Sequence, residues 1–485
     1  MNKFPWLLLV CSCCVIPVMC FLALGWIASE LALALWLGTV VLVAILWEAV
    51  TKDGAGINVS ISNPAGLYGI FYALYYPGSL LSFCVQKDLP RQHIVEIGLF
   101  VLLGYIAWRS GMALSGVGGV EWRYPELGER ERGSVLFLCW VGFAAVLVGY
   151  AYKVSVGAFF THGANFIQDT TLTASLLNNL TFPFEGPVIM LSALLSGRET
   201  GKKSAKKSFW IFLSVVIAVH LAAGEFRLIA TDLLLCAAVM QFASGLRLTR
   251  SRLIAGLCAC FVCLLSIQGA RVANQSAGGG GRGPVESARL LEDGVKSLAA
   301  GTANGVGENT ASRASIGVLF FSDVMDAVGR GQPYIYGTVI FDQMKSMVPR
   351  AVWPDKPEFV SPQVAIKIAL GLPEGDDAPG PLVSYYAFGG PVLVFCGYLL
   401  FGLLLGGFFR WAAQSRGLLA WMVLFWVLWG VVFLEGEITM ELAGALRHCI
   451  VGYMLYRVIL FFYPQEKVSR FGERLPYSLR SKVVS

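Results

Sequence analysis

The sequence is organised around the run MVPRAVWPDKP, residues 347–357, which lies inside a long polar segment from Val272 to Ser384. Nearly all of the remaining chain is apolar enough to lie in a lipid bilayer. This polar segment is therefore the one sizeable part that we expect to fold in water and to meet a polar substrate. The apolar helices are expected to be its scaffold.

The composition indicates an integral membrane protein. Of the 485 residues, 56% are hydrophobic and 14% are charged, whereas soluble domains carry roughly 25% charged residues; the mean hydropathy is +0.66. The net charge of +6 comes from Lys and Arg in short loops between apolar runs, so we expect no nucleic-acid partner. All 12 cysteines lie in apolar segments, which predicts small buried side chains and no disulfide framework.

The apolar runs predict an all-α polytopic protein with about twelve transmembrane helices. Residues 1–272 hold the first nine, 273–384 form a large loop with short helices, 385–463 hold the last three, and 464–485 are a basic tail. The first run is long enough to span, and we expect it to be an anchor, not a cleaved signal. The runs are residues 6–27, 31–50, 65–86, 94–114, 134–156, 182–197, 209–223, 227–244, 253–272, 385–409, 417–436 and 440–463.

The basic loops predict the orientation, because Lys and Arg gather on the cytoplasmic side of a membrane. With twelve spans these loops share one side, both termini are cytoplasmic and the loop 273–384 is extracytoplasmic. Lys87 and Arg91 are the exceptions. The basic residues that set the orientation are Arg123, Arg130, Arg132, Arg198, Lys202, Lys203, Lys206, Lys207, Arg247, Arg250, Arg252, Arg410, Arg416, Lys467, Arg470, Arg474, Arg480 and Lys482.

Two parts of the large loop have a pattern of their own. The stretch Asn274–Pro284 contains a run of glycines and is predicted to be too flexible to hold a fixed shape. Between Ser315 and Val328, apolar residues recur at helical spacing. They predict an amphipathic helix that lies on the membrane or packs on the spans.

Several common catalytic motifs are missing. The chain has no Walker loop, HExxH or GxSxG, and its four histidines, His93, His162, His220 and His448, lie in separate segments. Hydrolytic metal chemistry and ATP-driven transport are therefore disfavoured, and we expect no metal and no cofactor. The loop after the first span, at Ser29 and Glu30, is too short for the acidic metal-binding pair that one class of membrane glycosyltransferases carries there.

Four arginines form the candidate site. Arg227 lies in a predicted tight turn at 224–227, Arg271 ends the ninth span, Arg350 lies in the proline-rich run and Arg447 lies inside the twelfth span. The planar guanidinium suits a pyrophosphate, and in a membrane helix it costs about 3 kcal/mol unless it is paired. Alternatively, each arginine pairs with a carboxylate or reaches the lipid headgroups. The carboxylates considered are Glu225, Asp232, Glu437 and Glu441.

The run 347–357 is also a candidate sugar-binding segment. Its prolines keep the backbone extended, and Trp353 offers a flat apolar face on which a sugar ring can stack. Arg350, Asp355 and Lys356 flank that face. The alternative is a rigid strap whose Trp353 anchors in lipid headgroups.

These motifs resemble a known family. The run 347–357, followed by SYYAFGGP at 384–391, looks like the signature of the Wzy-type oligosaccharide repeat unit polymerases, which build bacterial O-antigens and exopolysaccharides. The sequence GEFR at 224–227 is similar to the arginine-bearing turn of that family, with Glu225 in place of a small residue. Arg447 falls where a last-span arginine is often found. The motifs cover a small part of the chain, whereas the plan of many spans with one large late loop matches over most of it.

The resemblance implies a glycosyltransferase C-like architecture and a metal-independent, inverting glycosyl transfer. The reaction would take place on the outer face of the bacterial cytoplasmic (inner) membrane. A growing glycan on undecaprenyl pyrophosphate would be the donor, and a hydroxyl of another lipid-linked repeat unit the acceptor. The implied partners are lipid-linked oligosaccharides, membrane lipids and a chain-length regulator protein.

The resemblance also implies roles for single residues. The departing pyrophosphate needs charge stabilisation, for which the candidates are Arg227, Arg271, Arg350 and Arg447. Substrate binding is assigned to Trp353, Asp355, Lys356 and Tyr385. The attacking hydroxyl needs a base, and its identity stays open. The candidates are Asp323, Asp342, Asp355 and His448.

Three other functions remain as alternatives. A transporter or flippase of lipid-linked glycans would show two similar halves, whereas here one long loop occurs once and late. A ligase of the O-antigen type would share the donor and the arginines, and the tryptophan–proline run favours a polymerase over it. A non-catalytic assembly component would leave Arg350 and Arg447 unexplained.

The predicted orientation can be tested with a reporter fused within residues 285–310. Because the basic loops should lie in the cytoplasm, a periplasmic phosphatase reporter at that position should be active and a cytoplasmic fluorescent reporter dark. Reporters fused within 200–207, in a predicted cytoplasmic loop, are the control and should behave the opposite way. A cytoplasmic signal from 285–310 would contradict the orientation.

Overall fold

The fold was analysed in a computed structural model of the chain. The structure describes residues 29–53, 56–59, 64–83, 93–117, 129–156, 172–196, 203–244, 250–276, 283–299, 306–335, 362–373, 380–415 and 418–432, and the single residues 345, 353, 450, 453, 454 and 457.

The described part is helical apart from one antiparallel hairpin of β1 (Val50–Asp53) and β2 (Gly56–Val59). Each predicted apolar run from 31–50 to 417–436 coincides with a helix; the run 6–27 and nearly all of 440–463 lie outside the described residues. The helices are α2 (Ser29–Ala49), α3 (Pro64–Phe83), α4 (Ile94–Leu114), α5 (Glu129–Ser155), α6 (Leu172–Ser196), α7 (Lys203–Ala223), α8 (Phe226–Ser244), α9 (Arg250–Ser276), α10 (Pro284–Ala299), α11 (Val306–Gly329), α13 (Pro362–Leu370), α14 (Gly380–Gln414) and α15 (Leu418–Val432).

Four of these helices are long and apolar enough to cross a membrane: α4, the part of α5 from Arg132 to Ser155, α7 and α14. Their outward faces are apolar too. On α14, Val392, Leu400 and Leu404 are exposed, while Tyr398 on the other side is fully buried. An apolar outer face is what lipid neighbours require. The chain is therefore a helical membrane protein, and the total of twelve spans stays a prediction.

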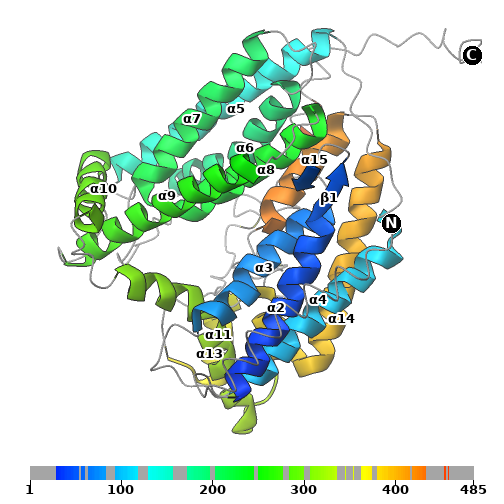
Figure 1. Ribbon diagram of the computed structural model, residues 1–485. Coiled ribbons are helices and arrows are strands. Elements are labelled where there is room, and N and C mark those ends of the chain that lie inside the picture. Colours follow the sequence, from blue (N-terminus) through cyan, green and yellow to red (C-terminus); the bar gives the residue numbers. More distant parts are fainter. Residues whose placement is uncertain are drawn as a thin grey trace, which may run out of the picture.

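The helices form two groups (Figure 1). In one, α5, α6, α7 and α8 pack together, with α9 and then α10 along the side; in the other, α2, α3, α4 and α14 pack together. Helix α15 lies between the groups, since it contacts α6 and α8 on one side and α3 and α14 on the other. The two groups are thus joined through α15.

Glycines allow α4 and α14 to approach each other backbone to backbone. A methyl group added at Gly111 of α4 would collide with the carbonyl oxygen of Leu399, and one added at Gly402 of α14 would collide with that of Trp108. Small residues at helix crossings permit such close packing in membranes. The same device joins α9 to α10, where Gly269 lies against Gly294.

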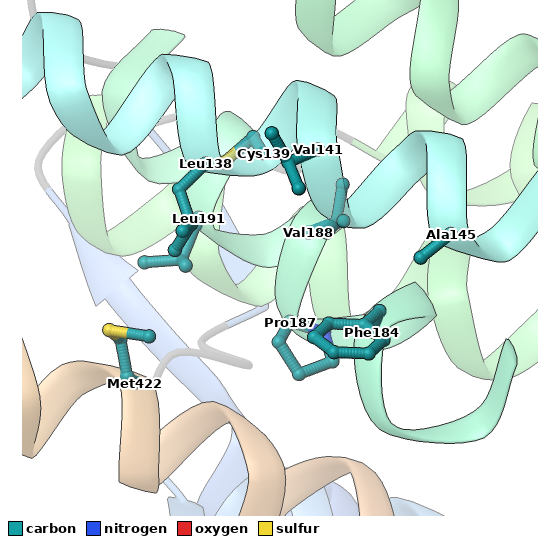
Figure 2. Close-up of a pocket in the computed structure, with 10 residues that line it drawn as sticks. Leu138, Cys139, Val141, Ala145, Phe184, Pro187, Val188, Leu191 and Met422 are labelled. Atoms are coloured by element: carbon teal, nitrogen blue, oxygen red, sulfur yellow. The ribbon is translucent and has the colours of Figure 1, made fainter. Parts of the chain in front are cut away.

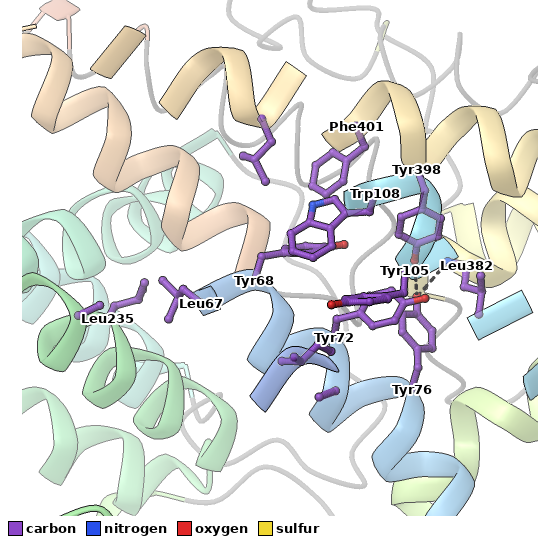
Figure 3. Close-up of a cluster of buried hydrophobic side chains, with 14 of the residues drawn as sticks. Leu67, Tyr68, Tyr72, Tyr76, Tyr105, Trp108, Leu235, Leu382, Tyr398 and Phe401 are labelled. Carbon is purple, nitrogen blue, oxygen red and sulfur yellow. Dashed lines mark hydrogen bonds between the residues drawn. The ribbon is translucent and has the colours of Figure 1, made fainter. Parts of the chain in front are cut away.

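Tyrosines link the helices of the group of α2, α3, α4 and α14 (Figure 3). Tyr68, Tyr72 and Tyr76 recur every fourth residue of α3, so they share one face. The Tyr72 hydroxyl donates to the Val101 carbonyl over 2.6 Å, and the Tyr76 hydroxyl accepts from the backbone N–H of Leu382 over 2.9 Å. Leu382 lies in the first turn of α14, whose N–H groups have no partner within the helix. The tyrosines therefore satisfy the backbone as well as fill the core.

The motif SYYAFGGP forms a kink inside α14. Gly389 and Gly390 leave the helical conformation, Gly390 with φ +66°, a region that glycine enters without strain. Pro391 has no N–H to give the carbonyl of Ala387 four residues earlier. That carbonyl instead accepts the N–H of Ile335 over 3.0 Å. The kink therefore ties the end of the large loop to the helix that follows it.

The part of the large loop that the structure describes is mostly helical. The amphipathic helix predicted at 315–328 is confirmed as α11, although it begins earlier, at Val306. Its Asp326 contacts His93 at the start of α4 over 2.9 Å. The prediction that the chain is too flexible to hold a fixed shape from Asn274 onward was wrong for residues 274–276. These residues continue α9, because the fully buried Asn274 packs inside the protein.

The close approach of α4 and α14 predicts a size limit at Gly402. We expect Gly402→Leu to destabilise the protein by about 3 kcal/mol or more, because overpacking of this kind forces the helices apart. Gly407→Leu is the matched control, since Gly407 lies on the same helix with open space where a side chain would go. The measurement is thermal unfolding of both variants in detergent; equal losses would contradict the close packing.

Candidate functional site

Buried ionisable side chains gather where α5, α6, α7 and α8 meet. Glu185 on α6, His220 on α7 and Asp232 on α8 are each at most 3% exposed. One ligand atom from each of the three lies within 4.8 Å of the other two. We call these three residues the Glu–His–Asp cluster. Tyr150 of α5 and Glu225 of the α7–α8 turn lie beside it.

The turn between α7 and α8 forms because Gly224 ends α7. Gly224 has φ +73°, and its N–H donates to Leu221 while the N–H of Glu225 donates back to the carbonyl of His220 over 2.9 Å. This pair of bonds is the Schellman motif, which glycine at this position favours. The predicted tight turn at 224–227 is confirmed. Arg227 is the second residue of α8.

The turn places Glu225 against the imidazole ring of His220. The distance from His220 Nδ1 to Glu225 Oε2 is 2.9 Å, and the Tyr150 hydroxyl lies 3.3 Å from the same nitrogen. On the other side of the ring, Nε2 contacts Glu185 Oε1 and lies 3.6 Å from Asp232 Oδ2. Both nitrogens of one imidazole therefore face carboxylate oxygens.

The second oxygen of Glu185 is fixed by α5. The Tyr150 hydroxyl donates to Glu185 Oε2 over 2.9 Å, so Oε1 is left pointing at the histidine. The side chain of Tyr150 is itself buried. Four elements thus hold the cluster in place: α5 through Tyr150, α6 through Glu185, α7 through His220 and α8 through Asp232.

Arg271 reaches the same turn from α9. Its Nη2 donates to the carbonyl of Gly224 over 2.9 Å, and the side chain is 8% exposed. Two of the four predicted arginines, Arg227 and Arg271, therefore come to one end of α7 and α8. The alternative prediction for Arg271 was a pair with a carboxylate. The structure shows in addition a hydrogen bond from Arg271 to a backbone carbonyl.

An apolar cavity adjoins the cluster along α6 (Figure 2). It has a volume of about 70 Å³ and lies between α5, α6 and α15. Its lining begins at Phe184, the residue before Glu185, and continues along α6 to Leu191, with Met422 of α15 on the far side. Such a lining favours apolar groups over a sugar or a phosphate.

The other predicted site residues are only partly described. Trp353 is 37% exposed, and Asp323 on α11 is exposed as well. Tyr385 packs edge-on against Tyr398, with ring centroids 5.4 Å apart, so its ring lies in the packing around the α14 kink. The remaining predicted residues lie outside the described part of the chain: Arg350, Arg447, Asp342, His448, Asp355 and Lys356.

The Glu–His–Asp cluster was not predicted from the sequence. There His220 is one of four scattered histidines, and Asp232 was a candidate only as the partner of an arginine. The signal was present, because each of the three residues is an ionisable group inside an apolar helix, and such groups are functional candidates by default. That rule was applied to the arginines alone.

Comparisons of the chain with protein-family models, with curated proteins and with solved structures find no match.

Proposed function

We propose that this protein polymerises oligosaccharide repeat units carried on undecaprenyl pyrophosphate. The product is a bacterial surface polysaccharide or exopolysaccharide, and the reaction takes place on the outer face of the cytoplasmic membrane. In the proposed step, a hydroxyl oxygen of one lipid-linked unit attacks the anomeric carbon of the growing glycan. The bond from that carbon to the pyrophosphate breaks, and its electron pair leaves with the pyrophosphate.

The observation that carries the proposal is the meeting of Arg271 with the turn that bears Arg227. The Arg271 guanidinium is buried and bonded to the carbonyl of Gly224, which fixes it at the end of α7. Arg227 follows in the first turn of α8, where the helix N-terminus also favours negative charge. A buried guanidinium beside a helix N-terminus that carries a second arginine in its sequence suits a diphosphate leaving group.

The surroundings strengthen that electrostatic effect. A charge pair that attracts weakly in water attracts several times more strongly in a medium of low dielectric constant. The side chain of Arg271 is buried, so water screens its charge little. Donors held there in advance stabilise the charge that develops on the leaving group without having to reorganise.

The apolar cavity supports a lipid-borne substrate. The lipid carrier of the proposed substrate is a long hydrocarbon next to a diphosphate, so its site needs an apolar part beside a cationic part. The lining of the cavity between α5, α6 and α15 includes Phe184, and the next residue, Glu185, contacts His220 near the α7–α8 turn. This adjacency agrees with an amphiphilic ligand better than with a free sugar.

The attacking hydroxyl must lose a proton during the transfer. Asp342 and His448 remain the proposed bases, together with Asp323 and Asp355. Trp353, Asp355, Lys356 and Tyr385 remain proposed contacts for the sugars. Arg350 and Arg447 complete the proposed set of pyrophosphate ligands.

Removal of the proposed pyrophosphate ligands should abolish long glycan chains. We expect Arg227→Ala, Arg271→Ala, Arg350→Ala and Arg447→Ala each to lower polymer formation at least about 100-fold, because each removes charge stabilisation from the leaving group. The corresponding Lys variants should recover only part of it, since lysine lacks the planar fork. The measurement is the chain-length distribution of surface polysaccharide on gels, with protein levels in the membrane checked alongside.

The matched control for these variants is Arg330→Ala. Arg330 is an exposed arginine just after α11, in the same large loop, and its removal should leave chain lengths unchanged. Normal chain lengths in any of the Arg227, Arg271, Arg350 and Arg447 variants would remove that residue from the site.

The reaction itself can be tested with the purified chain. Incubated with lipid-linked repeat units alone, without nucleotide sugar or added metal, the protein should form polymer and release undecaprenyl pyrophosphate. Both products can be measured by mass spectrometry. Movement of lipid-linked units across a vesicle bilayer without polymer would favour the transporter instead. Transfer of a finished glycan to a different acceptor would favour the ligase.

A further inference from the structure

The Glu–His–Asp cluster has the composition of a metal site. It offers one imidazole nitrogen and two carboxylate oxygens, the set of ligands that zinc and its neighbours in the first transition row prefer. The three atoms, one each from Glu185, His220 and Asp232, lie within 4.8 Å of one another. They come from three different helices, so their convergence is a result of tertiary packing and not of local sequence spacing.

The spacing of the ligand atoms suits a tetrahedral ion. Zinc bonds to nitrogen and oxygen are about 2.0–2.1 Å long, which places neighbouring ligand atoms about 3.3 Å apart. The distance from His220 Nε2 to Asp232 Oδ2 is 3.6 Å. Nε2 also contacts Glu185 Oε1, and an ion at this point would replace that contact with one bond to each residue.

The groups behind the three ligands are those that orient metal ligands in proteins. A metal-bound histidine usually gives its other ring N–H to a carboxylate. Here Nδ1 of His220 lies 2.9 Å from Glu225 Oε2. The oxygen of Glu185 that points away from the site accepts the Tyr150 hydroxyl over 2.9 Å. Two of the three ligands are thus held in orientation by outer groups.

The charges around the histidine also call for a cation. Three carboxyl groups, those of Glu185, Glu225 and Asp232, face one imidazole, and Glu185 and Asp232 are at most 3% exposed. A histidine that binds a metal is neutral, so a divalent cation bound by Glu185, His220 and Asp232 brings two positive charges to this group. A protonated imidazole would bring one, and buried carboxylates are stabilised by cations held close to them.

We propose that Glu185, His220 and Asp232 bind a divalent transition-metal ion of the zinc class. The ion joins α6, α7 and α8 and thereby fixes the α7–α8 turn that Arg271 contacts. Magnesium fits less well, because it prefers six oxygen ligands and retains water. Three protein ligands leave the fourth position of a tetrahedral ion to water, and the ion takes no part in the proposed glycosyl transfer. The inference does not rest on the proposed polymerase activity, because metal binding can be measured without substrate.

The test uses the full-length protein, purified in detergent, stripped with a chelator and reloaded with Zn²⁺. Elemental analysis after removal of free metal should find about one zinc per chain. Saturating Zn²⁺ should raise the melting temperature by at least about 3 °C, because an ion that binds only the folded state stabilises it. Mg²⁺ at the same concentration should give a smaller rise.

Substitutions test whether the zinc ion binds at the Glu–His–Asp cluster. His220→Ala and Asp232→Asn should lose both the stoichiometric zinc and the zinc-dependent rise in melting temperature. Glu225→Gln, which changes an outer group, should keep the ion with an affinity about 10- to 100-fold weaker. His93→Ala is the matched control, because His93 also faces two carboxylates, Asp326 at 2.9 Å and Glu96 at 3.9 Å; its zinc content should equal that of the unsubstituted chain.

Two results would overturn the inference. One is a zinc content well below one per chain in the unsubstituted protein, with no change in melting temperature on reloading; the cluster would then hold protons only. The other is equal zinc binding in the unsubstituted, His220→Ala and Asp232→Asn proteins, which would place the ion elsewhere. The first result depends on the unsubstituted protein alone, so poor folding of a variant cannot obscure it.

Discussion

The interior of this helix bundle cannot solvate a charge, and that constraint governs the arrangement around α7 and α8. A charged side chain at the centre of a membrane helix costs about 3 kcal/mol on insertion scales, and removal of one member of a buried pair costs a similar amount or more. Glu185, His220 and Asp232 meet one another there, and these contacts offset part of that cost. The packing of α6, α7 and α8 is therefore tied to the chemistry of the cluster.

The two groups of helices meet the same constraint differently. In the group of α3, α4 and α14, tyrosine hydroxyls bond to backbone groups, as Tyr72 does with Val101 and Tyr76 with Leu382. Glycines at 111 and 402 bring the backbones together, so this group is held mainly by van der Waals contact and by hydrogen bonds to backbone groups. In the group of α5 to α9, contacts between ionisable side chains link one helix to the next. The first group is suited to rigidity, and the second to the binding of charge.

Much of the helical plan could be predicted from the sequence, because hydropathy is a local property. The apolar runs locate α2 to α9, α14 and α15. Hydropathy reports the apolar stretch and not the ends of the helix. Helix α6 begins at Leu172, ten residues before its predicted start, because polar residues such as Asn178 and Asn179 join the helix without raising its hydropathy.

The site was less predictable, because it depends on which helices become neighbours. The turn at 224–227 is a local feature, and Gly224 predicts it, because glycine is common just after the end of a helix. Arg271 approaches that turn although it lies 47 residues from Gly224 in the sequence. No periodic pattern in the sequence predicts this contact. The same holds for Glu185 and His220, which lie 35 residues apart on helices that the sequence does not pair. Ionisable residues within apolar helices identify the participants, and only the packing identifies the partners.

Helix α6 connects the polar and the apolar features of the molecule. Glu185 turns to the cluster, whereas Phe184, Pro187 and Leu191 line the apolar cavity shared with α5 and α15. A rotation or shift of α6 would move both sets of side chains at once. The contacts of Glu185 with His220 and Tyr150 hold α6 against α5 and α7. The same helix forms one wall of the cavity, so a substitution that displaces α6 would alter the cluster and the cavity together.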